Sequence, residues 1–153
     1  MIKIYTDGAS KGNPGPGGYG TILEYKGKKK ELSEGFRMTT NNRMELLAVI
    51  IGLEEIKKDG WQVLVVSDSK YVVDAVEKGW VISWEKKNFK GKKNEDLWRR
   101  FLKVFYRHQV KFKWIKGHAG HPQNERCDRL AVAAAEGSHL LVDQVFEADR
   151  NAQ

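Results

Sequence analysis

The sequence of 153 residues has one cysteine, Cys127, three prolines and no long run of apolar residues. A single cysteine excludes an internal disulfide and removes any reason to place the protein in an oxidising compartment. No segment approaches the roughly 20 apolar residues that a membrane helix needs, and the N-terminal stretch lacks the apolar core of a signal peptide. We therefore expect a soluble, unprocessed protein of the cytoplasm that does not associate with a membrane.

Acidic residues are the scarcer charge, with 20 Asp plus Glu against 27 Lys plus Arg and a formal net charge of +7. This excess favours a polyanionic partner, although it can equally serve only to keep the protein soluble. The length is that of one domain, and neither an internal repeat nor a linker divides the chain. A single compact unit is expected, with the monomer as the simplest oligomeric state.

The hydrophobic periodicity predicts a mixed α/β sheet. Strands are expected at residues 2–6, 19–25, 28–36, 63–66 and 110–114, and helices at residues 42–60, 69–79, 94–108 and 123–135. The first strands are antiparallel in character, whereas the continuous apolar run at 63–66 is typical of a strand that is covered on both faces and parallel to its neighbours. Asn42, with Glu45 three residues later, is predicted to cap the first helix.

Four acids stand at the ends of predicted strands or near the starts of predicted helices: Asp7, Glu45, Asp68 and Asp128. Any one of them, taken alone, is best explained as a helix cap or as a solvated acid. Taken together they suggest one site, because strand ends and helix starts converge at the edge of an α/β sheet where ligands bind.

Carboxylates gathered in this way repel one another, by about 4 kcal/mol for each pair at about 4 Å and an effective dielectric constant near 20. Such a cluster must hold protons or bind cations. Oxygen ligands without a Cys or His set select Mg²⁺ or Mn²⁺ over zinc. The four acids therefore predict a divalent-metal site.

The segments around these acids, at residues 4–10, 41–46, 66–72 and 124–128, resemble the four active-site segments of ribonuclease H, type 1, in the same chain order. Residues 114–122, Trp-Ile-Lys-Gly-His-Ala-Gly-His-Pro, resemble the mobile histidine loop of that family. The resemblance implies a ribonuclease H-like fold, in which a mixed five-stranded sheet, antiparallel in its first three strands and then parallel, has helices on both faces. It covers residues 1–136, as one catalytic domain, and leaves residues 137–153 as a C-terminal tail that is either docked or frayed.

The resemblance also implies an endonuclease that hydrolyses the RNA strand of an RNA–DNA hybrid and leaves 5′-phosphate and 3′-hydroxyl ends. It assigns two Mg²⁺ ions in the presence of substrate, with Mn²⁺ as a substitute. By this similarity Asp7 bridges both ions, Glu45 and Asp68 complete the leaving-group side, and Asp128 holds the ion that activates water. His118 assists proton transfer or product departure, a role that suits an imidazole.

Contacts to the hybrid are implied at Asn13, Thr40, Asn41 and Asn42, which match family positions that touch the minor groove and the phosphates. Short polar side chains suit the recognition of 2′-hydroxyl groups. The competing interpretation is that Asn13 belongs only to a turn and that Asn42 is only a helix cap.

Residues 80–93 interleave aromatic side chains with lysines and resemble the basic protrusion by which bacterial members of the family grip the DNA strand. Its implied contacts are Trp80, Trp84, Lys86, Lys87 and Phe89. Trp80 and Trp84 can equally pack a helix against the core, and a run of charge is usually a solvated face. The protrusion is short, and Lys70 stands where the family often has a glutamine, which suggests a phosphate contact at that position.

Two alternatives to this enzyme remain open at this point. One is a non-catalytic binding module for an RNA–DNA hybrid or double-stranded RNA, against which the retention of all four acids and His118 argues. The other is a nuclease of related architecture that acts on DNA, which the asparagines at 13, 41 and 42 disfavour.

Overall fold

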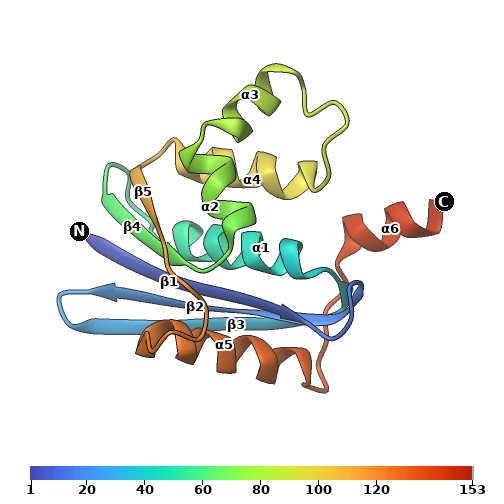
Figure 1. Ribbon diagram of the computed structural model, residues 1–153, viewed down its shortest axis with the longest axis horizontal. Coiled ribbons are helices and arrows are strands. Elements are labelled where there is room, and N and C mark those ends of the chain that lie inside the picture. Colours follow the sequence, from blue (N-terminus) through green and yellow to red (C-terminus); the bar gives the residue numbers. More distant parts are fainter. Residues whose placement is uncertain (153) are drawn as a thin grey trace.

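The computed structural model describes residues 1–152 and contains one mixed sheet with the strand order β3-β2-β1-β4-β5 (Figure 1). The strands are β1 (Ile2–Ser10), β2 (Gly15–Tyr25), β3 (Lys28–Thr39), β4 (Gln62–Ser67) and β5 (Gln109–Trp114). β2 pairs antiparallel with both β1 and β3, whereas β4 pairs parallel with both β1 and β5. The predicted five-stranded sheet, antiparallel at first and then parallel, is confirmed.

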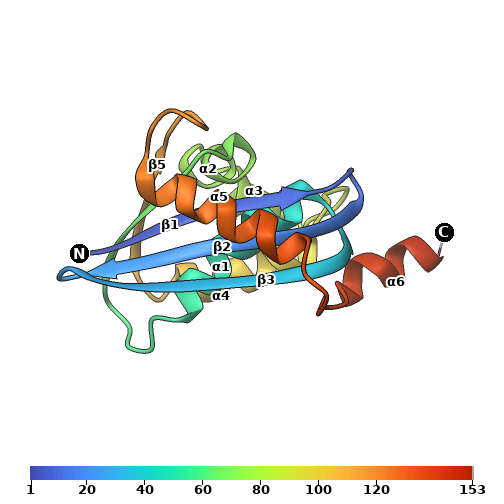
Figure 2. The ribbon, with the colours of Figure 1, turned by 90° about the horizontal axis from the view of Figure 1, so that it is seen from below.

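Helices cover both faces of this sheet, as Figures 1 and 2 show from two directions. They are α1 (Asn41–Glu54), α2 (Lys70–Glu77), α3 (Trp80–Lys86), α4 (Glu95–Phe105), α5 (Pro122–Ala135) and α6 (Gln144–Ala152). α1 packs on β1 and β2 and has α4 on its other side, while α5 packs on the opposite face against β1, β2 and β3. Among the described residues no helix is long and apolar enough to cross a membrane.

The first two strands are longer than predicted, so the glycine-rich loop shrinks to the short connection between Ser10 and Gly15. Ladder pairing explains this, because Ala9 and Ser10 pair with Gly18 and Gly17 although glycine has a low strand propensity. The pattern of side chains could not reveal that pairing, since it depends on the neighbouring strand.

The predicted cap of α1 is wrong by two residues. The Oγ1 atom of Thr40 accepts a hydrogen bond from the backbone N–H of Arg43 at 3.2 Å, and the helix begins at Asn41. The helix also ends at Glu54, well before Gly60. Asn42, on the first turn, is therefore left with an exposed side chain that is free for another role.

The core lies between the sheet and the α1 face, and α1 is buried along nearly its whole length. Ile4, Leu46, Ile50, Val65 and Trp98 are all fully buried there. Burial of each such side chain contributes about 1.5–3 kcal/mol. This packing holds α1 rigidly against β1, which fixes the position of any functional side chain on its first turn.

The segment after α5 runs back along the edge of the sheet. The backbone N–H of Arg37 donates to the carbonyl of Leu141 at 2.9 Å, and the N–H of Leu141 donates to the carbonyl of Gly35 at 2.8 Å. α6 follows and is joined to β3 by an exposed ion pair between Arg37 and Glu147. The tail therefore lies beside β3, with α6 at the end of the sheet where α1 begins (Figure 1).

Candidate active site

Three of the four predicted acids lie together, carried by β1, the end of β4 and the N-terminal half of α1. Asp7 is in the C-terminal half of β1, Asp68 directly follows β4, and Glu45 is in α1. One carboxylate oxygen from each lies within 4.8 Å of the others. A spacing of this kind allows one cation to contact all three side chains.

The absence of a side chain at Gly8 makes this approach possible. A Cβ atom at that position would lie only 2.4 Å from the backbone nitrogen of Glu45. The N–H of Gly8 also donates to Asp7 Oδ1 at 2.9 Å, which restrains the orientation of that carboxylate. Close packing of strand and helix thus brings Asp7 and Glu45 together.

The fourth acid, Asp128, is placed by α5 and lines the same cleft as Asp7 and Asp68. It lies outside the group of three whose oxygens come within 4.8 Å of one another. α5 can approach β2 closely because Gly20 has no side chain. A Cβ atom at that position would lie only 2.2 Å from the carbonyl oxygen of Cys127. The site is therefore an acidic triad with one further carboxylate at the cleft.

The start of α5 is attached directly to the strand ends that carry the acids. The amide of Asn124 donates to the carbonyl oxygens of Thr6 at 3.4 Å and of Val66 at 3.2 Å. These two carbonyls belong to β1 and β4, one and two residues before Asp7 and Asp68. Asn124 is thus a positioning residue for the acidic site.

Burial and mutual repulsion disfavour the charged forms of the acids. Burial, and then the charge of Asp68, raise the pKa of Asp7 to about 8, although a hydrogen bond with Glu45 acts in the opposite direction. Burial, and then the charges of Asp7 and Asp68, raise the pKa of Glu45 well above its ordinary value. Near neutral pH the cluster is therefore stable only when it holds a proton or binds a cation.

The donor set fits a divalent cation. The Oε1 atom of Glu45 is buried and has no hydrogen-bond partner in the part of the chain that the structure describes. A buried carboxylate oxygen without a partner is costly, and a cation in contact with it removes that cost. This geometry supports the prediction that the acids form a metal-binding site.

The cleft beside the acids has a volume of about 20 Å³, which suits a water molecule or an ion rather than an organic cofactor. Its other wall is the loop between β5 and α5, which includes His118 and His121. His118 is exposed and has a left-handed backbone, with φ of 57°. Sequence and structure together therefore place an imidazole at the mouth of the acidic cleft.

Trp114 is a further residue of this region, and its role is not evident from the sequence. Its indole N–H donates to the carbonyl oxygen of Asp68 at 3.0 Å. The ammonium group of Lys70 lies 4.8 Å from the centre of the Trp114 ring. The one signal in the sequence was an aromatic residue at the first position of the segment that resembles the histidine loop, but only the fold reveals that it contacts Asp68.

Three of the four short polar residues predicted to contact the hybrid, at positions 13, 40, 41 and 42, lie in one groove. Asn13, Thr40 and Asn42 line a groove of about 830 Å³, whose other wall includes Lys92, Lys93 and residues of α6. Asn41 joins them through its backbone, whose N–H donates to Asn13 Oδ1 at 3.1 Å. The structure therefore brings the loop before β2 and the start of α1 to one surface.

The basic protrusion, residues 80–93, consists of α3 and the loop that leads to α4 (Figure 1). Trp80 is exposed, while Trp84 is half-buried with its ring centre 5.8 Å from that of Trp98. Lys86 and Lys87 are exposed. Trp84 therefore has both the packing role and an accessible surface.

Phe89 requires a correction. The predicted contact between Phe89 and the hybrid is wrong, because only 2% of this residue is exposed. The loop folds back so that the backbone N–H of Phe89 donates to the carbonyl of Trp84 at 2.8 Å, and Arg99 covers the ring. Phe89 anchors the protrusion to the core instead of touching a ligand.

Comparison with known proteins identifies the family. The ribonuclease H family model matches residues 1–136. A ribonuclease H from Desulforamulus reducens is 58% identical over 147 residues, which cover 93% of this chain and 92% of that protein. The chain belongs to the ribonuclease H family.

Solved structures of ribonucleases H agree with this assignment. LC9-RNase H1, described as a type 1 RNase H with the type 2 active-site motif, has a TM-score of 0.81 and 34% identity, over 90% of this chain and 73% of that one. LC11-RNase H1, solved in complex with an RNA/DNA hybrid, has a TM-score of 0.66 and 26% identity, over 89% of this chain and 97% of that one. The resemblance to ribonuclease H inferred from the sequence is confirmed.

Proposed function

We propose that this ribonuclease H is an endonuclease that hydrolyses the RNA strand of RNA–DNA hybrids and leaves 5′-phosphate and 3′-hydroxyl ends. The observation that carries the proposal is the acidic triad of Asp7, Glu45 and Asp68, with oxygens within 4.8 Å of one another at a cleft of a ribonuclease H fold. The complex of LC11-RNase H1 with an RNA/DNA hybrid supports the choice of substrate.

Asp7, Glu45, Asp68 and Asp128 are proposed to hold Mg²⁺, with Mn²⁺ as a substitute. When bound, Mg²⁺ would lower the pKa of the attacking water and neutralise charge on the scissile phosphate. The unpartnered Glu45 Oε1 and the raised pKa of Asp7 support this set of ligands, because a cation beside these carboxylates would stabilise their charged forms.

His118 is proposed to move a proton or to help the product leave. It lines the acidic cleft from an exposed loop, so its ring can reach a bound phosphate without a change in the sheet. His121 lines the same cleft but directly precedes α5 and Pro122, where it serves as the N-terminal flank of the helix. This difference makes His118 the better candidate.

The hybrid is proposed to lie across the groove between the start of α1 and the basic protrusion. Neutral donors and acceptors at one wall suit 2′-hydroxyl and phosphate contacts, and exposed cations at the other suit phosphates. The proposed contacts are Asn13, Thr40, Asn41, Asn42, Lys70, Trp80, Trp84, Lys86 and Lys87.

The test is an incubation of end-labelled RNA–DNA, RNA–RNA and DNA–DNA duplexes with Mg²⁺, with Mn²⁺ and with chelator. We expect internal cleavage of the RNA in the hybrid, in the presence of either metal and not with chelator. Binding of the hybrid without cleavage would instead identify a non-catalytic module, and cleavage of the DNA duplex would identify a DNA nuclease.

A further inference from the structure

We propose that Arg43 is a positioning residue that sets the width of the hybrid-binding groove, and that it depends on Asp143 of the C-terminal tail to do so. This inference rests on the proposed function, since it concerns how the same enzyme holds its hybrid. It assigns a role in substrate binding to a tail that lies outside residues 1–136, which match the family model.

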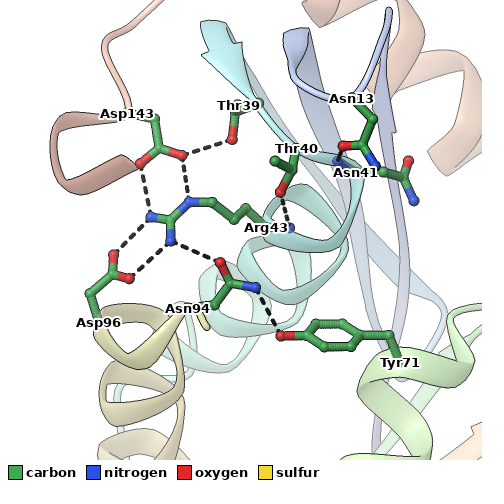
Figure 3. A network of polar contacts seen from close by, with 9 residues as sticks. All are labelled: Asn13, Thr39, Thr40, Asn41, Arg43, Tyr71, Asn94, Asp96 and Asp143. Atoms are coloured by element: carbon green, nitrogen blue, oxygen red, sulfur yellow. Dashed lines mark hydrogen bonds and ion pairs between the residues drawn. The ribbon is translucent and has the colours of Figure 1, made fainter. Parts of the chain in front are cut away.

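Arg43 is buried, with 3% of its surface exposed, and two carboxylates hold its guanidinium (Figure 3). Asp96 accepts two hydrogen bonds from Arg43, at 2.9 and 2.8 Å. Asp143 accepts two more, at 2.7 and 2.9 Å. Forked contacts of this kind fix both distance and orientation, so one side chain joins α1 to α4 and to the tail.

Two of the partners of Arg43, Asp143 and Asn94, are themselves held in place by further hydrogen bonds. Thr39, the last residue of β3, donates its hydroxyl to Asp143 at 2.7 Å. Asn94 accepts from Arg43 at 3.3 Å and donates to the hydroxyl of Tyr71 at 2.9 Å. The network in Figure 3 therefore runs without a break from the tail through α1 to α2.

The ends of this network are the two walls of the groove. Arg43 directly follows Thr40, Asn41 and Asn42, and Thr40 caps its backbone N–H. Asn94 and Asp96 come shortly after Lys92 and Lys93, which end the protrusion and line the opposite wall. The guanidinium therefore fixes the gap across which the two strands of the hybrid must be held.

Arg43 does this without offering a free charge to the phosphates. Burial alone would lower its pKa, but the hydrogen bonds that it donates to Asp96 and Asp143 raise the pKa of the guanidinium above its ordinary value. The two carboxylates therefore more than offset the cost of burying the charged guanidinium. Loss of Asp143 removes one of the two anchors and frees the guanidinium to turn, which changes the groove without touching the acidic triad.

The experiment compares Asp143→Asn with Glu147→Gln. Both variants remove one carboxylate by which the tail is attached, but Glu147 pairs with the exposed Arg37 and does not reach Arg43. Kinetics are measured on a labelled hybrid with Mg²⁺, well below the melting temperature of each protein. Binding of the same hybrid is measured by fluorescence anisotropy over a series of salt concentrations.

We expect Asp143→Asn to raise KM by about tenfold, as for a residue that couples to a site without touching the ligand. Its kcat, and both constants of Glu147→Gln, should stay within about twofold of the wild type. Thr39→Val, which removes only the hydroxyl that orients Asp143, should raise KM by a smaller factor and serves if Asp143→Asn fails to fold.

Unchanged KM in Asp143→Asn and Thr39→Val would overturn the proposal, and so would an equal rise in Glu147→Gln. A fall in KM with a steeper salt dependence would also overturn it, because the freed Arg43 would then bind phosphate directly. None of these results affects the proposed function, which fails only if the wild-type protein leaves the hybrid uncut.

Discussion

At the scale of single residues, the carboxylates of Asp7 and Glu45 are held in a state that suits a metal site and opposes stability. Both are buried, and burial together with the charge of Asp68 raises the pKa of each, while the charge of Asp7 raises that of Glu45 further. The fold therefore stores repulsion that a bound cation relieves.

Asp7→Asn should lower kcat by about four orders of magnitude, as for the loss of one member of a catalytic group that acts as a unit. The fold should persist, and without metal the melting temperature should rise by about 2–4 °C for each kcal/mol of repulsion removed. Activity assays and thermal denaturation in chelator test this. Glu125→Gln, an exposed acid on the same cleft, is the control and should remain active. An unfolded or fully active Asp7→Asn protein would contradict the assignment.

The metal-free protein should become less stable as the pH rises from about 4 to about 8. Asp7 has its pKa raised from 3.8 to about 8, so the folded state binds this proton more tightly than the unfolded chain does. The stability that this bound proton contributes is fully present below the pKa of Asp7 in the unfolded chain. It is lost as the pH rises through the pKa of Asp7 in the folded protein. Melting curves in chelator measure it. Asp7→Asn should flatten the dependence, and a slope of opposite sign would disprove the assignment.

His118→Ala should lower kcat by about 100-fold, at the lower end of the range for general acid–base groups, because the acidic site remains intact. His121→Ala is the matched control, since it lines the same cleft and should change kcat little. Steady-state kinetics on a labelled hybrid distinguish the two. Equal losses in both variants would mean that the loop as a whole, and not one imidazole, matters.

At the scale of elements, the basic protrusion has one side packed against the core and one basic side exposed to solvent. Phe89 and the inner side of Trp84 attach it to α4, while its lysines remain in solvent. Lys92 lies 5.1 Å from the centre of the Trp84 ring, so an aromatic and a cationic group share the accessible side. Such a pairing can contact bases, sugars and phosphates without reading sequence.

Replacing Lys86, Lys87, Lys92 and Lys93 with Gln should raise KM more than it lowers kcat, because these charges bind ground state and transition state alike. The slope of log affinity against log salt should fall by about 0.9 for each phosphate that the protein no longer neutralises. The matched control replaces Lys28, Lys29, Lys57 and Lys58, which line another groove beside the β2–β3 turn. A decrease in kcat at constant KM, or an equal effect of the control, would argue against the assignment.

At the scale of the whole molecule, the tail closes the structure by returning to β3 and to the buried Arg43. Leu141 pairs with β3 at the edge of the sheet, and Asp143 is the second carboxylate that binds the guanidinium of Arg43. α6 lies beyond these attachments and is joined to the rest by the exposed Arg37–Glu147 ion pair and by the Phe146 ring, whose centre lies 5.9 Å from the guanidinium of Arg43. The stabilising part of the tail is therefore the segment before α6.

A chain that ends at residue 136 should be less stable by about 3–5 kcal/mol, the scale of removing one partner from a buried ion pair. A chain that ends at residue 144 retains Leu141 and Asp143 and should be destabilised much less. Urea denaturation of both truncated proteins and of the full chain measures the difference. Similar stability of the two truncated chains would contradict this division of the tail.

The amino-acid sequence determined the fold class, the family and the identity of the acids, because period, turn signals and local motifs are properties of neighbouring residues. Only the tertiary structure decided which side chains meet. In the folded protein Phe89 is buried beneath Arg99, and Thr40 caps α1 in place of Asn42. Arg43 pairs with Asp96 and Asp143. Partners some 50 and 100 residues away leave no local pattern, since their pairing follows from how strands and helices pack and from the need to neutralise a buried charge.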